Sequence, residues 1–249
     1  MKVGSAGSLT IVGTGIRLAS QITLEALEEI KRADVVLYLA GDAATPAWLR
    51  GLNPSAESLS DCYREGRPRS ATYREIAGRI LSHVRAGRRV AAAFYGHPGV
   101  GVNPAHAALR QALREGYAAR MLPGISAEAC LVAELGVDPL VLGWQSHEAS
   151  EFLSRRPRFD PRCALVLWQL GLIYQPSINF SGRTNPRGVA DLARALRASY
   201  PASHSVVLYE ASPFPVCDSR IEPVTLREID TRIVRLGTTL YVPPLPRRR

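Results

Sequence analysis

The chain has 249 residues, of which 46% are hydrophobic and 21% charged, and it carries a formal net charge of +9 at pH 7. This length excludes a minimal binding module and admits either one large α/β domain or two smaller ones. No stretch approaches the roughly 18 consecutive apolar residues that span a bilayer. The N-terminus also lacks the long apolar segment and small-residue cleavage site of a secretion signal. We therefore expect a cytoplasmic protein with no membrane partner.

The basic residues are almost entirely arginine, since Lys2 and Lys31 are the only lysines among 31 basic residues. The arginines are spread along the expected helices and do not form a stripe with interleaved aromatic residues, so we expect no nucleic-acid partner. The four cysteines lie far apart, without the spacing of a zinc or redox site, and are expected to be mostly small buried hydrophobic residues. They are Cys62, Cys130, Cys163 and Cys217.

Short apolar runs alternate with segments of helical period through the first 140 residues, which is typical of a mostly parallel sheet. Strands are expected at residues 7–12, 35–39, 90–95 and 117–122. Helices are expected at 23–33, 70–86, 103–115 and 126–135. Gly87 is placed to end the second helix in a left-handed conformation, Asn103 to cap the third, with Pro104 in its first turn, and Ser126 to cap the fourth.

A domain boundary is expected near Asp138, which divides the chain into domains at 1–138 and 139–249. The second part has strand patterns at residues 163–169, 204–209 and 239–242 and a helix pattern at 188–198, joined by proline-rich loops. These elements indicate a mixed sheet. The predicted fold class is therefore α/β, with two α/β domains.

Three glycine-containing turns follow expected strands. Gly13-Thr14-Gly15 lacks the further glycine of a dinucleotide site, because that position is Leu18, so a nicotinamide or flavin site is not expected. The turns at residues 95–104 and 122–128 each lie between a strand and a helix, so both should lie at the carboxyl end of the sheet, where open α/β folds bind ligands. His97 in the first of these is open to two interpretations, a structural hydrogen bonder or a catalyst.

The motifs in these turns resemble those of the borosin peptide α-N-methyltransferases of the tetrapyrrole-methylase superfamily. The resemblance follows the chain in order and covers nearly all of it. Its segments are GSLTIVGTGI at 7–16, FYGHPGV at 94–100, MLPGISAE at 121–128, LWQLG at 167–171, NFSG at 179–182, VVLYEA at 206–211 and YVPP at 241–244.

The resemblance implies a homodimeric class III methyltransferase with a donor-binding cleft between its two domains. Its methyl donor would be S-adenosylmethionine, with S-adenosylhomocysteine as product and no metal. The donor contacts carried over from the family are Tyr95, His97, Val100, Val102, Ser126, Ala127, Gln169, Tyr209, Gly237, Thr238 and Thr239.

The resemblance also implies a catalytic cluster of Tyr63, Arg69, Tyr73 and Tyr95. Without it, Arg69 and Tyr73 are four residues apart at the start of an expected helix and so share one face, where a guanidinium and a phenol can converge on one substrate. The alternative is an amphipathic helix whose polar side meets water. Ser60, where some relatives carry another tyrosine, and Gly101, where a bulkier residue can occur, depart from the family's pattern.

Methylation of a backbone amide explains why such a cluster is needed. The amide nitrogen is a poor nucleophile because its lone pair is delocalised into the carbonyl, so its proton must leave as the methyl arrives. Tyr63 or Tyr73 is the expected base, with an adjacent arginine favouring the phenolate. Arg69 is expected to face the substrate carbonyl oxygen and stabilise the charge that develops there.

The expected activity is therefore α-N-methylation of a precursor peptide in the biosynthesis of a ribosomally made natural product. The best-known borosins carry their substrate as a C-terminal extension, whereas this sequence ends shortly after Pro243-Pro244, so we expect a precursor supplied in trans. Three alternatives remain. They are a small-molecule methyltransferase acting on a precorrin-like ring, an enzyme acting on RNA, and a non-catalytic donor-binding partner protein.

Overall fold

The computed structural model of the protein describes residues 7–178 and 184–246. The chain forms two compact units, unit 1 from Met1–Cys130 with Ser212–Asp218 and unit 2 from Leu131–Ala211 with Ser219–Arg249. The division lies between Cys130 and Leu131, inside a helix, whereas the sequence pattern predicts it near Asp138. Residues 212–218 also return to unit 1, which makes that unit discontinuous in sequence.

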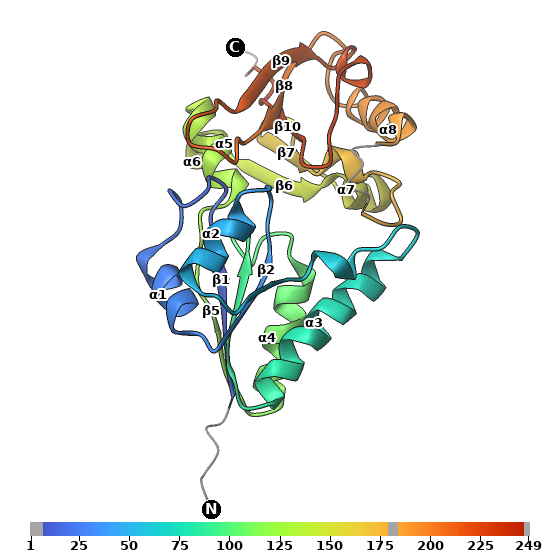
Figure 1. Ribbon diagram of the computed structural model, residues 1–249. Helices are drawn as coiled ribbons and strands as arrows, with labels where there is room; N and C mark the ends of the chain where they lie inside the picture. The colour runs from blue at the N-terminus through green and yellow to red at the C-terminus, as the bar shows by residue number, and fades with distance from the viewer. Residues whose placement is uncertain (1–6, 179–183, 247–249) are drawn as a thin grey trace, which may run out of the picture. The chain divides into compact units, whose positions relative to one another are not determined.

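Unit 1 is a parallel α/β unit, and Figure 1 shows its strands running side by side with helices around them. Its five-stranded sheet has the order β3-β2-β4-β1-β5, and its neighbouring strands pair in parallel. The strands are β1 (Ser8–Gly13), β2 (Val35–Leu39), β3 (Ala56–Ser58), β4 (Arg89–Phe94) and β5 (Ala118–Met121). The helices are α1 (Leu24–Arg32), α2 (Thr45–Leu52), α3 (Arg69–Arg85) and α4 (Asn103–Arg114), with a 3-10 turn at Ser60–Cys62. Helix α5 (Ala127–Leu135) begins in unit 1 and continues into unit 2.

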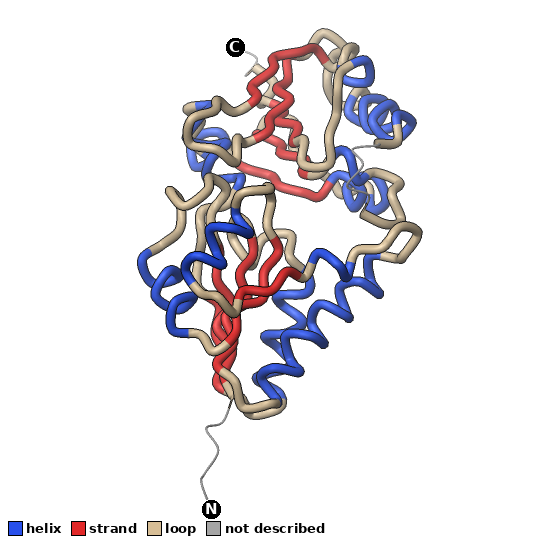
Figure 2. The backbone as a smooth tube through the Cα atoms, in the orientation of Figure 1, coloured by secondary structure: helices blue, strands red, loops and turns tan. Residues whose placement is uncertain are grey.

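The sheet of unit 1 is covered on both faces, which explains why its central strands are apolar along their whole length. Leu9, Ile11 and Leu37 pack with the buried side of α3 and α4. Val36 and Tyr38 belong to a second cluster with residues of α1 and α2. The tube in Figure 2 shows the helices of unit 1 on either side of its strands. The parallel sheet predicted for the first 140 residues is confirmed.

Most helix boundaries in unit 1 follow from the predicted caps. Gly87 has φ +80°, and Arg88 N–H donates to the His83 carbonyl at 3.2 Å, so α3 ends as predicted. Ser126 Oγ accepts the Ala129 N–H at 3.1 Å, as expected for the cap of α5. The prediction for α4 was wrong by one residue, because the cap position is Val102, whose carbonyl accepts the first turn's N–H groups, and no side chain caps the helix.

Unit 2 contains a mixed five-stranded sheet of order β6-β7-β10-β8-β9. β6 and β7 are parallel and the other pairs are antiparallel, as predicted for this part of the chain. The strands are β6 (Trp144–Glu148), β7 (Ala164–Trp168), β8 (Ser205–Glu210), β9 (Arg220–Thr225) and β10 (Thr239–Val242). The helices are α6 (Pro139–Leu142), α7 (Ala149–Arg155) and α8 (Pro186–Leu196), with 3-10 turns at Leu170–Leu172 and Ile229–Thr231.

One face of the second sheet is covered by α7 and α8. Leu165, Leu208 and Leu240 of neighbouring strands pack with Phe152 of α7 and Leu192 of α8 in a single buried cluster. Helix α8 presents an apolar stripe at helical spacing, which fits one side buried and one side in water. The predicted α/β fold class is thus confirmed in both units.

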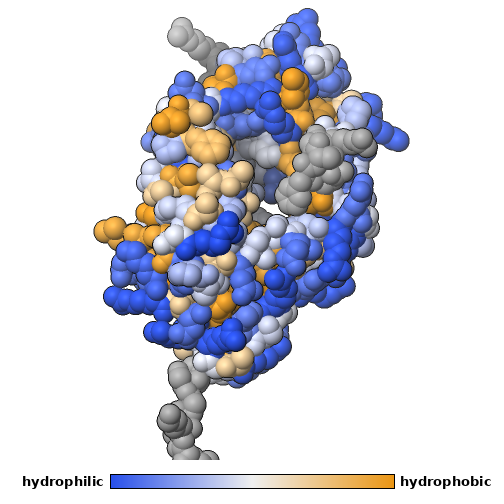
Figure 3. Space-filling model, viewed as in Figure 1, coloured by the Kyte–Doolittle hydropathy of each residue, from blue (hydrophilic) through white to orange (hydrophobic). Residues whose placement is uncertain are grey.

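The surface mixes hydrophilic and hydrophobic residues, and the face seen in Figure 3 shows no single stripe of one kind. Cys62 and Cys130 are buried as expected, whereas Cys217 is exposed, because it lies in the connection between β8 and β9. No described helix is long and apolar enough to cross a membrane. The NFSG motif at 179–182 lies outside the described residues.

Candidate active site

Three glycine-containing turns of unit 1 meet at the carboxyl end of its parallel sheet. A Cβ added to Gly13 would lie 2.3 Å from the carbonyl oxygen of Gly96 and 3.1 Å from the Cα of Gly124. The Gly96 N–H also donates to the Gly15 carbonyl at 2.7 Å. Only glycine allows backbones to approach this closely. The prediction that these turns share one edge of the sheet is confirmed.

The loop at residues 96–102 is held by two histidines. The Nδ1 atom of His97 accepts the Gly99 N–H at 2.9 Å, and the Val100 N–H donates to the His97 carbonyl at 3.1 Å. His106 of α4 donates from Nε2 to the Gly99 carbonyl, also at 2.9 Å. His97 is therefore a structural hydrogen bonder in this loop, and His106, which the sequence analysis missed, is its second anchor.

The predicted donor-contacting residues of this loop differ in exposure. Val100 is 49% exposed, whereas Val102 packs against the core under α3 and α4. Tyr95 is also 49% exposed, and one face of its ring lies against Gly41, where an added Cβ would meet the ring at 3.1 Å. A role for Gly41 beside Tyr95 was not predicted. The only sequence feature that points to it is its position shortly after an expected strand.

The predicted catalytic tyrosines lie near one another in unit 1. Tyr63 and Tyr73 pack against the same hydrophobic cluster. The pKa of Tyr63 is raised by burial first and then by Tyr73 and Tyr95, and burial and Tyr73 raise the pKa of Tyr95. About half of the Tyr95 surface is exposed, so the raised pKa of Tyr95 reflects the atoms packed around it and not complete burial. These mutual effects place the three hydroxyls within electrostatic reach of each other.

The raised pKa of Tyr63 corrects one expectation. An adjacent arginine was expected to favour the phenolate of Tyr63 or Tyr73, but burial of Tyr63 outweighs any such stabilisation. Burial therefore favours the protonated phenol at Tyr63. It can donate a hydrogen bond, but it is a weak candidate for the base.

The arginines near the tyrosine cluster differ in their pairing. Arg69 is the first residue of α3 and lies one turn before Tyr73, so the two share the helix face as predicted. Arg67 is paired with Glu75, and Arg79 with Asp61 at 2.5 Å. Among the described residues no carboxylate or other side chain pairs with Arg69. Its guanidinium is thus available to a substrate oxygen.

Tyr73 also lines an open groove between α3 and α4 with a volume of about 680 Å³. Asn103 lies at the same end of the helices, and Arg74 and Arg110 add positive charge to the groove. Tyr73 is therefore half-buried beside the tyrosine cluster and borders this groove, so a substrate can approach it from the surface of unit 1.

The predicted donor-contacting residues of unit 2 come together at one end of its sheet. Thr239 pairs with Tyr209 across β10 and β8. The Leu170 N–H donates to the Thr238 carbonyl at 2.9 Å, which brings the turn after Gln169 beside the start of β10. Gln169 itself has φ +61°, an unusual left-handed conformation for a residue with a side chain.

These unit 2 residues do not offer the same chemistry. The Tyr209 hydroxyl donates to Glu134 at 2.9 Å and the residue is buried. Thr238 has no exposed surface, and its hydroxyl donates to Glu210 while accepting the Arg235 N–H. Gly237 is exposed, with open space where a Cβ would stand. Backbone at Gly237 is thus accessible to a ligand, whereas Thr238 serves mainly to hold the loop.

These features fit a ligand that lies against backbone. A Cβ would also meet open space at Gly101 in the loop of unit 1, and Ser126 and Ala127 stand at the start of α5 with half-buried side chains. Within residues 7–178 and 184–246 no three His, Cys, Asp or Glu side chains are placed to hold a metal ion. The open space at Gly101 is compatible with an organic donor that lies against this loop.

Residues 8–230 match the family model described as Tetrapyrrole (Corrin/Porphyrin) Methylases. The chain is 43% identical over 243 residues to the methyltransferase/ribosomally synthesized cyclic peptide gymnopeptides precursor of Gymnopus fusipes, covering 96% of this chain and 58% of that one. It is 40% identical over 245 residues to the methyltransferase/ribosomally synthesized type I borosin cyclic peptide precursor of Coprinopsis marcescibilis, covering 96% and 62%. The chain thus spans about three fifths of the length of these relatives.

Among solved structures, the chain resembles uroporphyrin-III-C-methyltransferase from Thermus thermophilus, with a TM-score of 0.67 and 20% identity. The match covers 96% of this chain and 92% of that one. At this identity the likeness concerns the fold alone. It agrees with the parallel sheet of unit 1 and the mixed sheet of unit 2.

Proposed function

Because the chain belongs to the tetrapyrrole (corrin/porphyrin) methylase family, we propose that it is an S-adenosylmethionine-dependent methyltransferase that methylates backbone amides of a peptide. The observation that carries the peptide substrate is the 43% identity, along 96% of this chain, to a relative named as methyltransferase and cyclic peptide precursor together. The class III methyltransferase fold is common to this chain and the tetrapyrrole enzymes. The fold alone does not show which molecule accepts the methyl group.

When bound, S-adenosylmethionine supplies an electrophilic methyl group on a positively charged sulfur. The residues we propose to hold it lie in both units. In unit 1 they are Tyr95, His97, Val100, Val102, Ser126 and Ala127, and in unit 2 they are Gln169, Tyr209, Gly237, Thr238 and Thr239. His97 and Thr238 would act through the loops that they hold, since their hydrogen bonds are made within the protein.

Tyr73 is the proposed base that removes the amide proton. It lies next to Tyr63 and Tyr95 and borders the groove between α3 and α4. Arg69, one turn earlier on the same helix face, would bind the carbonyl oxygen of the same amide and stabilise the negative charge that forms as the proton leaves. This charge and the proton loss make the nitrogen nucleophilic.

Tyr63 would have a different task. Burial keeps its hydroxyl protonated, so it can donate a hydrogen bond to the substrate carbonyl or to the Tyr73 oxygen. A donor at that position favours the deprotonated form of Tyr73. The cluster thus divides into a base, a charge stabiliser and a hydrogen-bond donor. Tyr95 would close the site from the β4 side.

Two further parts of the proposal concern assembly. We propose that the precursor peptide is supplied in trans and that the chain acts as a homodimer. The first is tested by mixing the purified chain with a separately produced peptide. The second is tested by light scattering of the eluting protein, where a monomeric mass for a chain active on the peptide would contradict it.

The decisive experiment is intact-mass spectrometry of a peptide incubated with the chain and S-adenosylmethionine. Suitable peptides are one encoded beside the gene and the precursor segment of the Gymnopus fusipes relative. We expect successive single-methyl gains on backbone nitrogens. Arg69→Ala should slow the reaction about 100- to 1,000-fold and Tyr73→Phe about 100- to 10,000-fold.

Matched controls separate a role in the site from a general loss. Arg32→Ala removes an exposed arginine at the end of α1, and Tyr174→Phe removes a half-exposed phenol in unit 2. Both should methylate at the wild-type rate. Donor binding without methylation of any peptide would favour the small-molecule acceptor, and a precorrin-like ring would then be the next substrate to try.

A further inference from the structure

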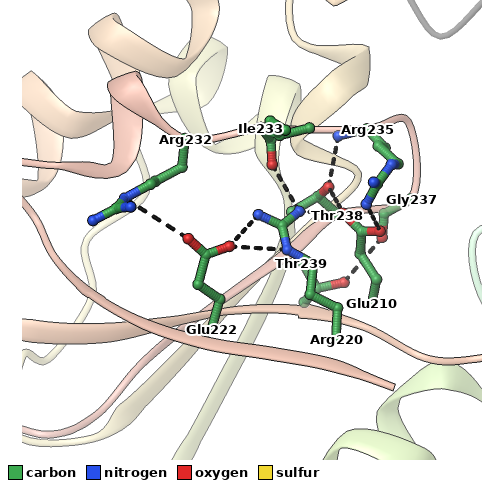
Figure 4. Close-up of polar contacts among 9 residues, drawn as sticks. All are labelled: Glu210, Arg220, Glu222, Arg232, Ile233, Arg235, Gly237, Thr238 and Thr239. Atoms are coloured by element: carbon green, nitrogen blue, oxygen red, sulfur yellow. Dashed lines mark hydrogen bonds and ion pairs between the residues drawn. The ribbon is translucent and has the colours of Figure 1, made fainter. Parts of the chain in front are cut away.

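A carboxylate in unit 2 gathers the segment that leads into β10. Glu210, the last residue of β8, accepts the Thr238 hydroxyl at 2.5 Å and an Arg220 N–H at 2.7 Å through Oε1. Its Oε2 accepts a hydrogen bond from the Arg235 guanidinium at 2.8 Å. Figure 4 shows these three side chains converging on Glu210 from two different parts of the chain.

The strand register explains why Glu210 can do this. Glu210 is directly opposite Arg220 in the antiparallel pair of β8 and β9. On its other side β8 pairs with β10, where Tyr209 is opposite Thr239, so Thr238 falls beside Glu210. The Glu210 and Arg220 side chains are only 19% and 22% exposed, which strengthens their attraction relative to a surface pair.

The same network holds the segment 233–238 at several points. Arg220 donates to the Ile233 carbonyl at 2.7 Å. The backbone N–H of Arg235 donates to the Thr238 hydroxyl, also at 2.7 Å, so Thr238 links its own loop to Glu210. Glu222 pairs with the same Arg220 and reaches Arg232, the residue before this segment, at 3.7 Å. Glu210 thus contacts this segment directly at two residues, Arg235 and Thr238, and a third time through Arg220.

The effect extends to the turn that follows Gln169. Thr238, which Glu210 holds by its hydroxyl, accepts the Leu170 N–H through its carbonyl at 2.9 Å. A Cβ added to Gly171 would lie 2.4 Å from the Arg235 carbonyl oxygen, so the two segments are in close contact. A continuous series of hydrogen bonds therefore runs from Glu210 through Thr238 to the residue after Gln169.

We propose that Glu210 is a positioning residue that holds the segment 233–239, and through Thr238 the Gln169 turn, in the conformation that binds S-adenosylmethionine. The inference rests on the proposed function, because it takes these segments as donor-binding. Glu210 would act through its contacts with Thr238, Arg220 and Arg235.

The role requires a carboxylate at this position. Burial raises the pKa of Glu210, but hydrogen bonds from Thr238, Arg235 and Arg220 outweigh it and the net pKa is lowered. A glutamine has nearly the same shape, but it lacks the charge and presents an NH₂ group in place of one oxygen. That group would face a hydroxyl or a guanidinium, both of which need an acceptor.

The test compares three single variants of the full chain, and the double variant Glu210→Gln/Thr238→Val, by calorimetric titration with S-adenosylmethionine and by hydrogen exchange of residues 233–239 and 169–172. Glu210→Gln weakens the central acceptor, and Thr238→Val removes the same hydrogen bond from the other side. Glu222→Gln is the matched control, since Glu222 pairs with Arg220 and Arg232, which both lie outside residues 233–239. Thermal unfolding of each variant accompanies the titrations.

We expect Glu210→Gln and Thr238→Val to bind the donor about tenfold or more weakly, because each loses a hydrogen bond to a charged group. Both should show faster hydrogen exchange in the two segments. The double variant should bind S-adenosylmethionine no more weakly than the single variant with the lower affinity. Glu222→Gln should bind as the wild type does. Thr238→Val keeps the test decisive if Glu210→Gln does not fold.

Wild-type affinity and exchange in Glu210→Gln or Thr238→Val would overturn the inference while leaving the proposed function intact. An equal loss of affinity in Glu222→Gln would also overturn it, because the effect would then belong to the sheet as a whole. A wild-type chain that binds no S-adenosylmethionine would overturn the proposed function itself, and the inference with it.

Discussion

The contact of three turns at Gly13 predicts a large effect from a single methyl group. In Gly13→Ala the new Cβ would lie 2.3 Å from the Gly96 oxygen and 2.9 Å from Pro98 Cδ. Contacts under 3.0 Å are essentially never seen for Cβ atoms, so the oxygen must retreat by at least 3.0 − 2.3 = 0.7 Å. The atoms met are backbone and a proline ring, which cannot rotate away.

We expect Gly13→Ala to lower the free energy of unfolding by about 1–3 kcal/mol, the usual cost of overpacking. At about 2–4 °C per kcal/mol for a chain of this size, the unfolding temperature falls by about 2–12 °C. Donor affinity should fall as well, because the loop that carries His97 and Val100 is displaced. Calorimetric unfolding and donor titration measure the two effects.

Gly51→Ala and Gly78→Ala add the same methyl group in helices α2 and α3, where nothing lies within 4 Å of the new Cβ. They should stabilise the chain by about 0.5–1 kcal/mol, because alanine loses less conformational freedom on folding. A Gly13→Ala chain as stable and as tightly donor-binding as the wild type would refute the reasoning that the three turns leave no room.

Three further predictions concern stability. Tyr200 has a buried hydroxyl without a hydrogen-bond partner among the described residues. Tyr200→Phe should therefore raise the free energy of unfolding by about 1–3 kcal/mol, measured by denaturant titration. A lower free energy of unfolding would contradict this. Asn53→Ala leaves the Ile30 and Ala33 carbonyls unpaired and should cost about 2–3 kcal/mol in the same assay, whereas no loss would show that these groups find other partners. Arg85 and Gln111 lower the pKa of Glu115 to about 2 from 4.5. The wild type should therefore lose the stability contributed by Glu115 as pH falls from 4.5 to 2, and Glu115→Gln should lose less over that range; identical pH profiles would count against the assignment.

The central strands of both sheets could be predicted from the sequence. β1, β2 and β4 are apolar runs buried on both faces, and such runs are recognisable without tertiary information. The turns that end them are recognisable too, because these turns need the backbone conformations that glycine and proline favour. Helix ends at Gly87 and Ser126 followed from local hydrogen bonding. Local chemistry was sufficient for each of these features.

The strands that the sequence analysis missed are all edge strands. β3 borders the first sheet, and β6 and β9 border the second. An edge strand pairs on one side only and carries fewer buried residues, so its pattern is weak. β9 even contains Pro223, which is tolerated at an edge because one side needs no N–H donor.

The sequence, together with the family resemblance, predicts which tyrosines, which arginine and which glycine turns make up the candidate site. Only the tertiary structure decided how these groups behave. Burial raises the pKa of Tyr63, and ion pairs occupy Arg67 and Arg79, whereas no carboxylate among the described residues pairs with Arg69. Glu210 acquires its three partners from strands and a loop far apart in sequence. Residue type and local spacing determine the elements, whereas desolvation and long-range pairing depend on the distances that folding creates.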